Sequence, residues 1–140
     1  MPFSIEIDQK RYLVIVKYWG IFDLKALEEE LAALDGMGPF DDRYRRLTVF
    51  DEHLQIVVST DQLRSMAQQR SKGLRWKQLP FHPKAKRVIV APFELAFGLA
   101  RLYGGEVANT DIQHTVVRTI TEAAAELGMD AADLDTSFPV

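Results

Sequence analysis

An uninterrupted apolar run, Tyr12 to Val16, constrains the fold of this chain more than any other feature of its sequence. The run is rich in branched side chains and is apolar on both faces, so a strand formed there must be covered on both sides. Just before it, Ile5 and Ile7 alternate with polar residues, and the break at Asp8–Lys10 is typical of a turn. The sequence therefore predicts an antiparallel hairpin whose second strand lies inside a sheet.

Strand patterns and helical patterns alternate through the remainder of the chain. The predicted strands are Arg46–Asp51, Arg87–Ala91 and His114–Arg118. Capping residues predict helices that begin at Asp23, Ser59 and Thr119, and a further helix is expected over Phe93–Tyr103. Glycines are expected to end these helices at Gly36 and Gly38, at Gly104–Gly105 and at Gly128. Strands separated by helices in this way favour parallel pairing.

The spacing of leucines predicts which helix faces are buried. Leu24, Leu27, Leu31 and Leu34 form the expected stripe of the first helix, with Lys25, Glu28, Glu29 and Glu30 largely off it. Leu95, Leu99 and Leu102 form the stripe expected for the third helix. Phe93, Phe97 and Tyr103 on this helix are typical of core filling. The alternative is a pocket or dimer surface, which the position of Phe97 off the stripe suggests.

Together these patterns predict a single α/β domain over residues 1–140, with an acidic segment at 129–140 that holds one more turn near Ala131–Leu134. The expected architecture is a mixed, mostly parallel five-stranded sheet with an N-terminal antiparallel hairpin and about four helices. The predicted core residues are Leu13, Ile15, Leu27, Leu31, Leu47, Val49, Leu63, Ile89, Leu99 and Val116.

The composition of the chain excludes several kinds of functional site. The chain has no cysteine, which excludes disulfides, thiolate metal sites and a cysteine nucleophile. The first eight residues lack the apolar core of a signal peptide, and no apolar run approaches the ~20 residues of a membrane span. We therefore expect a cytoplasmic protein that does not span a membrane. The net charge of −3 makes nucleic acid an unlikely partner.

Two stretches carry a family resemblance. The segment Val88–Pro92, followed by Ala96–Tyr103, resembles a segment of small bacterial SpoIIAA-like proteins, which are related to STAS and SEC14-type domains. The order of elements from Ile5 to Gly128 is similar as well. The resemblance implies a sheet with helices packed on it, and it does not imply an activity.

The same resemblance singles out Ser59, Thr60 and Asp61. In STAS anti-sigma-factor antagonists, an Asp-Ser-Ser-Gly-Leu helix start carries a serine that a partner kinase phosphorylates. The corresponding stretch here, Val58–Leu63, keeps two hydroxyls and the leucine but lacks the leading aspartate and the glycine. Ser59 and Gln62 also fit a capping box, which accounts for the serine structurally. The alternative is a switch or anion site at Ser59, Thr60 and Asp61.

A basic segment follows this helix start. Between Gln62 and Phe93 the chain has eight basic residues and no acidic residue. A solvated surface is one interpretation, and an interaction patch is the other. The residues of the predicted patch are Arg64, Arg70, Lys72, Arg75, Trp76 and Lys77. An acidic protein or an anionic lipid would suit such a patch, and it could also mediate a homodimer.

No catalytic constellation is readable in the sequence. His53, His82 and His114 have no metal-ligand spacing, and the adjacent Asp51 and Glu52 are more typical of a solvated loop. We therefore expect no metal, no cofactor and no enzymatic activity. The predicted function is a non-enzymatic regulatory or protein-interaction domain. The alternative is a small-ligand or lipid-binding module related to SEC14-type domains.

Overall fold

The computed structural model describes residues 3–71, 85–107, 114–134 and 137–138. Its main sheet has five strands in the order β1-β2-β4-β6-β7. They are β1 (Phe3–Asp8), β2 (Leu13–Tyr18), β4 (Arg45–Phe50), β6 (Arg87–Val90) and β7 (His114–Val117). β1 pairs antiparallel with β2, and the other three pairings are parallel. The predicted α/β architecture is confirmed.

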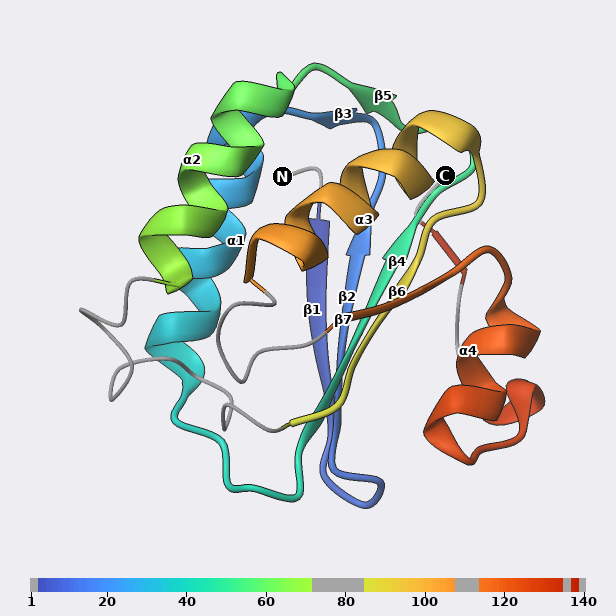
Figure 1. Ribbon diagram of the computed structural model, residues 1–140. Coiled ribbons are helices and arrows are strands. Elements are labelled where there is room, and N and C mark those ends of the chain that lie inside the picture. Colours follow the sequence, from blue (N-terminus) through green and yellow to red (C-terminus); the bar gives the residue numbers. More distant parts are fainter. Residues whose placement is uncertain (1–2, 72–84, 108–113, 135–136, 139–140) are drawn as a thin grey trace.

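β2 occupies the place that its sequence predicts. All six of its residues are buried, and it lies between β1 and β4. Three helices cover one face of the sheet: α1 (Leu24–Met37), α2 (Thr60–Ser71) and α3 (Glu94–Val107). Helix α4 (Ile120–Leu127) and the short 3-10 helix η2 (Ala131–Asp133) lie on the other face (Figure 1). Of the described helices, none is both long and apolar enough to cross a membrane.

A second, smaller sheet was not expected from the sequence. β3 (Ile21–Phe22) pairs parallel with β5 (Gln55–Ile56) beyond the carboxyl ends of β2 and β4. Each strand has only two residues, too few for a period-2 pattern to be recognised. The small sheet matters because β5 leads directly into the start of α2.

The predicted helix starts are confirmed by their capping bonds. The Asp23 carboxylate accepts a hydrogen bond from the Ala26 amide at 2.8 Å, and the Thr119 hydroxyl accepts one from Glu122 at 3.1 Å. At the end of α4, Gly128 takes the left-handed conformation with φ of 65°, as a glycine at this position is expected to do. However, α3 continues through Gly104 and Gly105 to Val107. A glycine can remain helical, so the expected stop at these two residues is wrong.

Eight of the ten predicted core residues are buried, and Leu99 and Val116 are only partly buried. Val116 lies on β7, an edge strand of the sheet, and Leu99 lies at the border of the cluster under α1 and α2. The leucine stripe predicted for α3 is wrong at Leu95, which is 56% exposed. Leu99 is partly buried, and the side chain of Leu102 lies outside the described residues. Instead, Ala96 and Ala100 face the sheet, and their small side chains let the helix pack closely against it.

Two further expectations about side chains are corrected by the packing. Phe97 packs partly against the cluster of Ile89 and Ala91, so its position off the leucine stripe reflects the true buried face of α3. Glu30 was expected off the buried stripe of α1 but is 0% exposed. It is tolerated inside because it forms an ion pair with Arg46 of β4.

Candidate functional site

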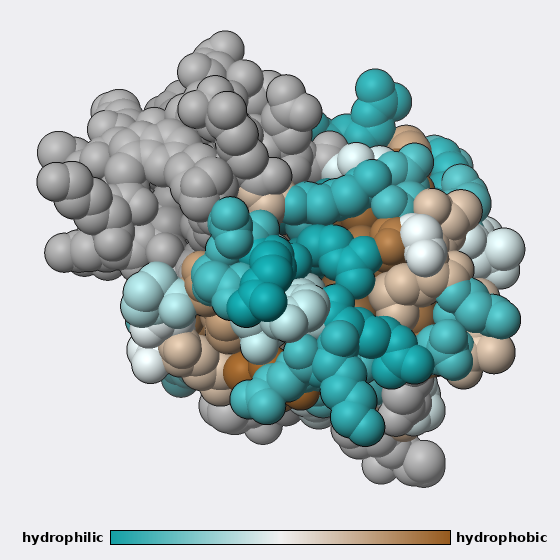
Figure 2. Space-filling model, turned by 90° about the horizontal axis from the view of Figure 1, so that it is seen from below, coloured by the Kyte–Doolittle hydropathy of each residue, from teal (hydrophilic) through white to brown (hydrophobic). Residues whose placement is uncertain are grey.

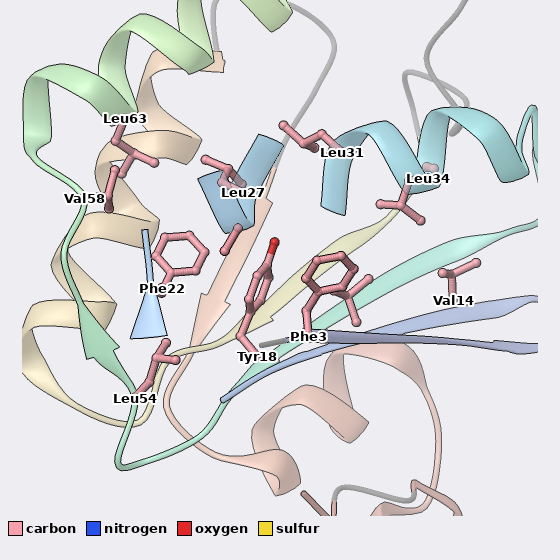
Figure 3. Close-up of a cluster of buried hydrophobic side chains, with 13 residues drawn as sticks. Phe3, Val14, Tyr18, Phe22, Leu27, Leu31, Leu34, Leu54, Val58 and Leu63 are labelled. Carbon is pink, nitrogen blue, oxygen red and sulfur yellow. The ribbon is translucent and has the colours of Figure 1, made fainter. Parts of the chain in front are cut away.

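The candidate site is the turn that joins β5 to α2. Two buried side chains anchor this turn on either side of Ser59: Val58 just before it and Leu63 in the first turn of the helix. Figure 3 shows both pointing toward Phe22 of β3, within the cluster of buried hydrophobic residues. Because its neighbours are fixed in the core, Ser59 is held at the surface in a defined orientation.

Ser59 forms the capping box that its spacing predicts. Its hydroxyl oxygen accepts a hydrogen bond from the Gln62 amide at 3.0 Å. In return, the Ser59 amide donates to Oε1 of Gln62, also at 3.0 Å. Two backbone donors that would otherwise lack a helical partner are thereby satisfied. The structural role of Ser59 is confirmed, and its role as a switch or anion site stays a prediction.

The turn brings the three predicted site residues together. Ser59, Thr60 and Asp61 are all exposed, and the Asp61 side chain is 93% exposed. The Asp61 carboxylate lies in the first turn, where the helix dipole favours a negative charge, and it is 3.9 Å from the Arg64 guanidinium. This carboxylate already places one negative charge at the helix start, which disfavours binding of a second anion there.

Two exposed apolar side chains lie on or next to the small sheet that leads into these polar residues. Val57 is 63% exposed and Ile21 is 52% exposed. The Val57 amide donates a hydrogen bond to the Phe22 carbonyl oxygen at 2.8 Å, which ties the end of β5 to β3. Side chains alternate along a strand, so Ile21 and Val57 share the face opposite to the buried Phe22. We call the five residues Ile21, Val57, Ser59, Thr60 and Asp61 the β5–α2 corner.

The basic patch predicted beyond this corner is described only in part. Arg64 lies on α2 with 45% of its side chain exposed. Arg70 belongs to the same helix, but its side chain lies outside the described residues. Lys72, Arg75, Trp76 and Lys77 also lie outside them. The patch therefore stays a prediction.

Buried charges inside the fold were missed by the sequence analysis. Arg46, which pairs with Glu30, also donates from Nε to the Thr48 hydroxyl at 3.0 Å. Its register neighbour on β6, Arg87, is 6% exposed and donates to the Ala85 carbonyl at 3.0 Å. The spacing of Glu30, three residues after Leu27 and four before Leu34, was a usable signal, because residues three and four apart share a helix face.

A second buried charge lies on the opposite face of the sheet. Lys17 is 2% exposed. Its ammonium donates to Glu6 Oε1 and to the Ser137 carbonyl, both at 3.1 Å. Phe138, next to Ser137, packs against the apolar cluster under α4. These contacts join β1, β2 and the segment after η2.

The opposite end of the molecule, at the hairpin turn, carries charges of both signs. Figure 2 shows this end from below, with hydrophilic side chains over much of the described surface and smaller apolar areas between them. Ion pairs join Asp8 to Arg11, Asp41 to Arg43, and Lys86 to Glu126, at 3.0, 2.9 and 3.2 Å. These cations are matched by neighbouring acids, so the charges of the described residues at this end are largely paired.

The fold is that of a SpoIIAA-like α/β domain, and this assignment rests on the comparison with solved structures. No protein-family model matches the chain, and no curated protein matches it. Among solved structures, it is similar to an uncharacterized protein of the DUF3478 family with a SpoIIAA-like fold from Shewanella loihica PV-4. The TM-score is 0.53 and the sequence identity is 18%, over 89% of this chain and 91% of that one.

Proposed function

We propose that this protein is a non-enzymatic interaction domain that binds a partner protein through the β5–α2 corner. The observation that carries the proposal is the exposure of Val57 and Ile21, 63% and 52%, at the small sheet that precedes the helix start. Apolar side chains surrounded by polar groups are typical of protein contact surfaces. The buried anchors Val58 and Leu63 support the proposal, because a rigid surface loses less conformational entropy on binding.

The hydroxyls of the corner give this surface a means of control. Ser59 and Thr60 are exposed on a helix start, where a phosphate adds roughly two negative charges beside the apolar residues. The Asp61 carboxylate already occupies the first turn, so a phosphate would meet a like charge there. We propose that a charge at Ser59 weakens binding to the partner.

The experiment is a quantitative capture of partners from the native host by the wild-type chain and by Val57→Ser, with Ile7→Ser as the control. Ile7 is 43% exposed but lies on β1, away from the corner. We expect a protein that is retained by the wild type and by Ile7→Ser and lost with Val57→Ser. Retention of every captured protein by Val57→Ser would contradict the proposal. Capture of lipid in place of protein would favour the ligand-binding alternative.

The proposed regulation by charge at Ser59 is tested with a matched pair of substitutions. Ser59→Asp and Ser59→Asn both keep a good helix cap, and only the first adds a charge. We expect Ser59→Asn to bind the captured partner as the wild type does and Ser59→Asp to bind more weakly. Equal binding by the two variants would show that charge at Ser59 does not control the surface.

The basic segment contributes a further expectation about the partner. Arg64, 45% exposed on the same helix, begins the run of basic residues beyond the corner. If the partner is acidic, Arg64→Glu should slow its association, and added salt should weaken binding by the wild type. Binding that responds to neither change would point to an apolar partner surface.

A further inference from the structure

Helix α3 has one face turned away from the domain. Ala96 and Ala100 are buried against the sheet, whereas Glu94, Leu95, Gly98 and Arg101 are exposed. At about 100° per residue, Gly98 lies at the centre of this exposed face. Glu94 and Arg101 lie on one side of Gly98, and Leu95 lies on the other. We call these four residues the α3 face.

The centre of the α3 face is open to close approach. A Cβ atom built on Gly98 would meet no atom of the described residues within 4 Å. Leu95, one turn earlier, exposes 56% of its surface. A small residue beside an exposed leucine allows a second helix to pack closely, with the leucine filling the space over the glycine.

The charges of the α3 face are complementary to those of a second copy in the antiparallel orientation. Glu94 lies about 6 Å before Gly98 along the helix axis, and Arg101 lies about 4.5 Å after it. Two antiparallel copies related by a twofold axis at Gly98 would therefore place Glu94 of each copy opposite Arg101 of the other. A parallel arrangement would instead oppose like charges, which is unfavourable.

We propose that the α3 face binds a second copy of this chain, with the two α3 helices antiparallel around Gly98. A twofold contact of this kind uses the same residues on both copies and closes on itself. Arg118 of the same copy fixes the position of the Glu94 carboxylate, which keeps lone pairs that can accept from Arg101 of the second copy. The Arg118 guanidinium is 2.7 Å from the Glu94 carboxylate and 4.1 Å from the centre of the Phe97 ring. This inference is independent of the β5–α2 corner.

Charge reversal gives the main test. Sedimentation equilibrium should show dimer formation by the wild type. Glu94→Lys and Arg101→Glu should each weaken the dimer at least about tenfold, because each opposes like charges twice. Mixing the two variants should restore association, since the mixed dimer pairs opposite charges on both sides. Lys25→Glu, 83% exposed on α1, is the control and should leave the dimer unchanged.

The absence of cysteine from the chain permits a second, covalent test of the geometry. Gly98→Cys places one thiol on each side of the proposed twofold axis, within reach of a disulfide. Mild oxidation should convert this variant to a covalent dimer at least about tenfold faster than Lys25→Cys. A wild type that stays monomeric at about 1 mM, a mixture of charge variants that stays monomeric, or equal oxidation of the two cysteine variants would overturn the proposal.

Discussion

Ser59 stabilises the start of α2 through both its side chain and its amide. Its contribution to the free energy of unfolding can be measured. Its hydroxyl accepts from Gln62, and Gln62 accepts from the Ser59 amide, each at 3.0 Å. We expect Ser59→Ala to lower the free energy of unfolding by about 0.5–2 kcal/mol, because it removes the cap. Ser59→Asn should lower the free energy of unfolding by only a few tenths of a kcal/mol, which is about the error of a denaturant measurement. Equal losses by the two variants would mean that capping is not the role of Ser59.

Asp8 is a residue whose charge the fold stabilises. The Arg11 side chain, 3.0 Å away, and the backbone amide of Arg11 donate to its carboxylate and hold its pKa below the ordinary value of 3.8. A lowered pKa in the folded state stabilises the fold above pH 3.8, and this contribution is lost as the pH falls through the folded value. NMR titration of the Asp8 carboxyl carbon should give a midpoint below 3.8, and Arg11→Gln should raise it. An unchanged midpoint in Arg11→Gln would contradict this assignment.

Among the elements, α3 shows where sequence periodicity is misleading. Its leucines predicted a buried stripe, but the helix contacts the sheet through Ala96 and Ala100, with Phe93 and Phe97 beside them. Hydrophobicity alone favours the larger side chains, whereas close packing on the sheet favours the smaller ones. The spacing of Glu30 on α1 indicated the buried face, but its ion pair with Arg46, from a strand that is distant in the sequence, could not be predicted.

Two neighbouring substitutions test which face of α3 is buried. Ala96 is 0% exposed, so Ala96→Leu should overpack the core and cost about 1–3 kcal/mol of unfolding free energy. Leu95 is 56% exposed, so Leu95→Ala should change that energy by less than about 0.5 kcal/mol. Chemical denaturation at a concentration where the chain is monomeric measures both. The opposite order of effects would restore the leucine stripe as the buried face.

For the whole molecule, the sequence patterns predicted the main sheet and its helices, but not the small second sheet or the buried charges. The apolar run that ends at Val16 predicted a strand inside the sheet, and the capping box at Ser59 predicted a helix start. Both are local patterns. The apolar border of the β5–α2 corner could not be predicted, because it depends on the pairing of β3 with β5, two strands of two residues each.

Lys17, through its contacts with Glu6 and Ser137, links segments that are 120 residues apart in the chain. Methionine fills a similar volume without a charge to desolvate, and Glu6, 47% exposed, and the exposed Ser137 can both be hydrated once the lysine is gone. Lys17→Met should therefore leave the free energy of unfolding unchanged or slightly higher. Glu6→Ala removes a partner of the buried ammonium and should cost about 1–3 kcal/mol. In Lys17→Met, the Ser137 carbonyl loses the hydrogen bond from the Lys17 ammonium. Hydrogen exchange should therefore become faster at Ser137–Phe138 than in the wild type, while β2 stays protected. Unchanged exchange at Ser137–Phe138 would mean that the packing of Phe138, and not the lysine, holds this segment on the sheet.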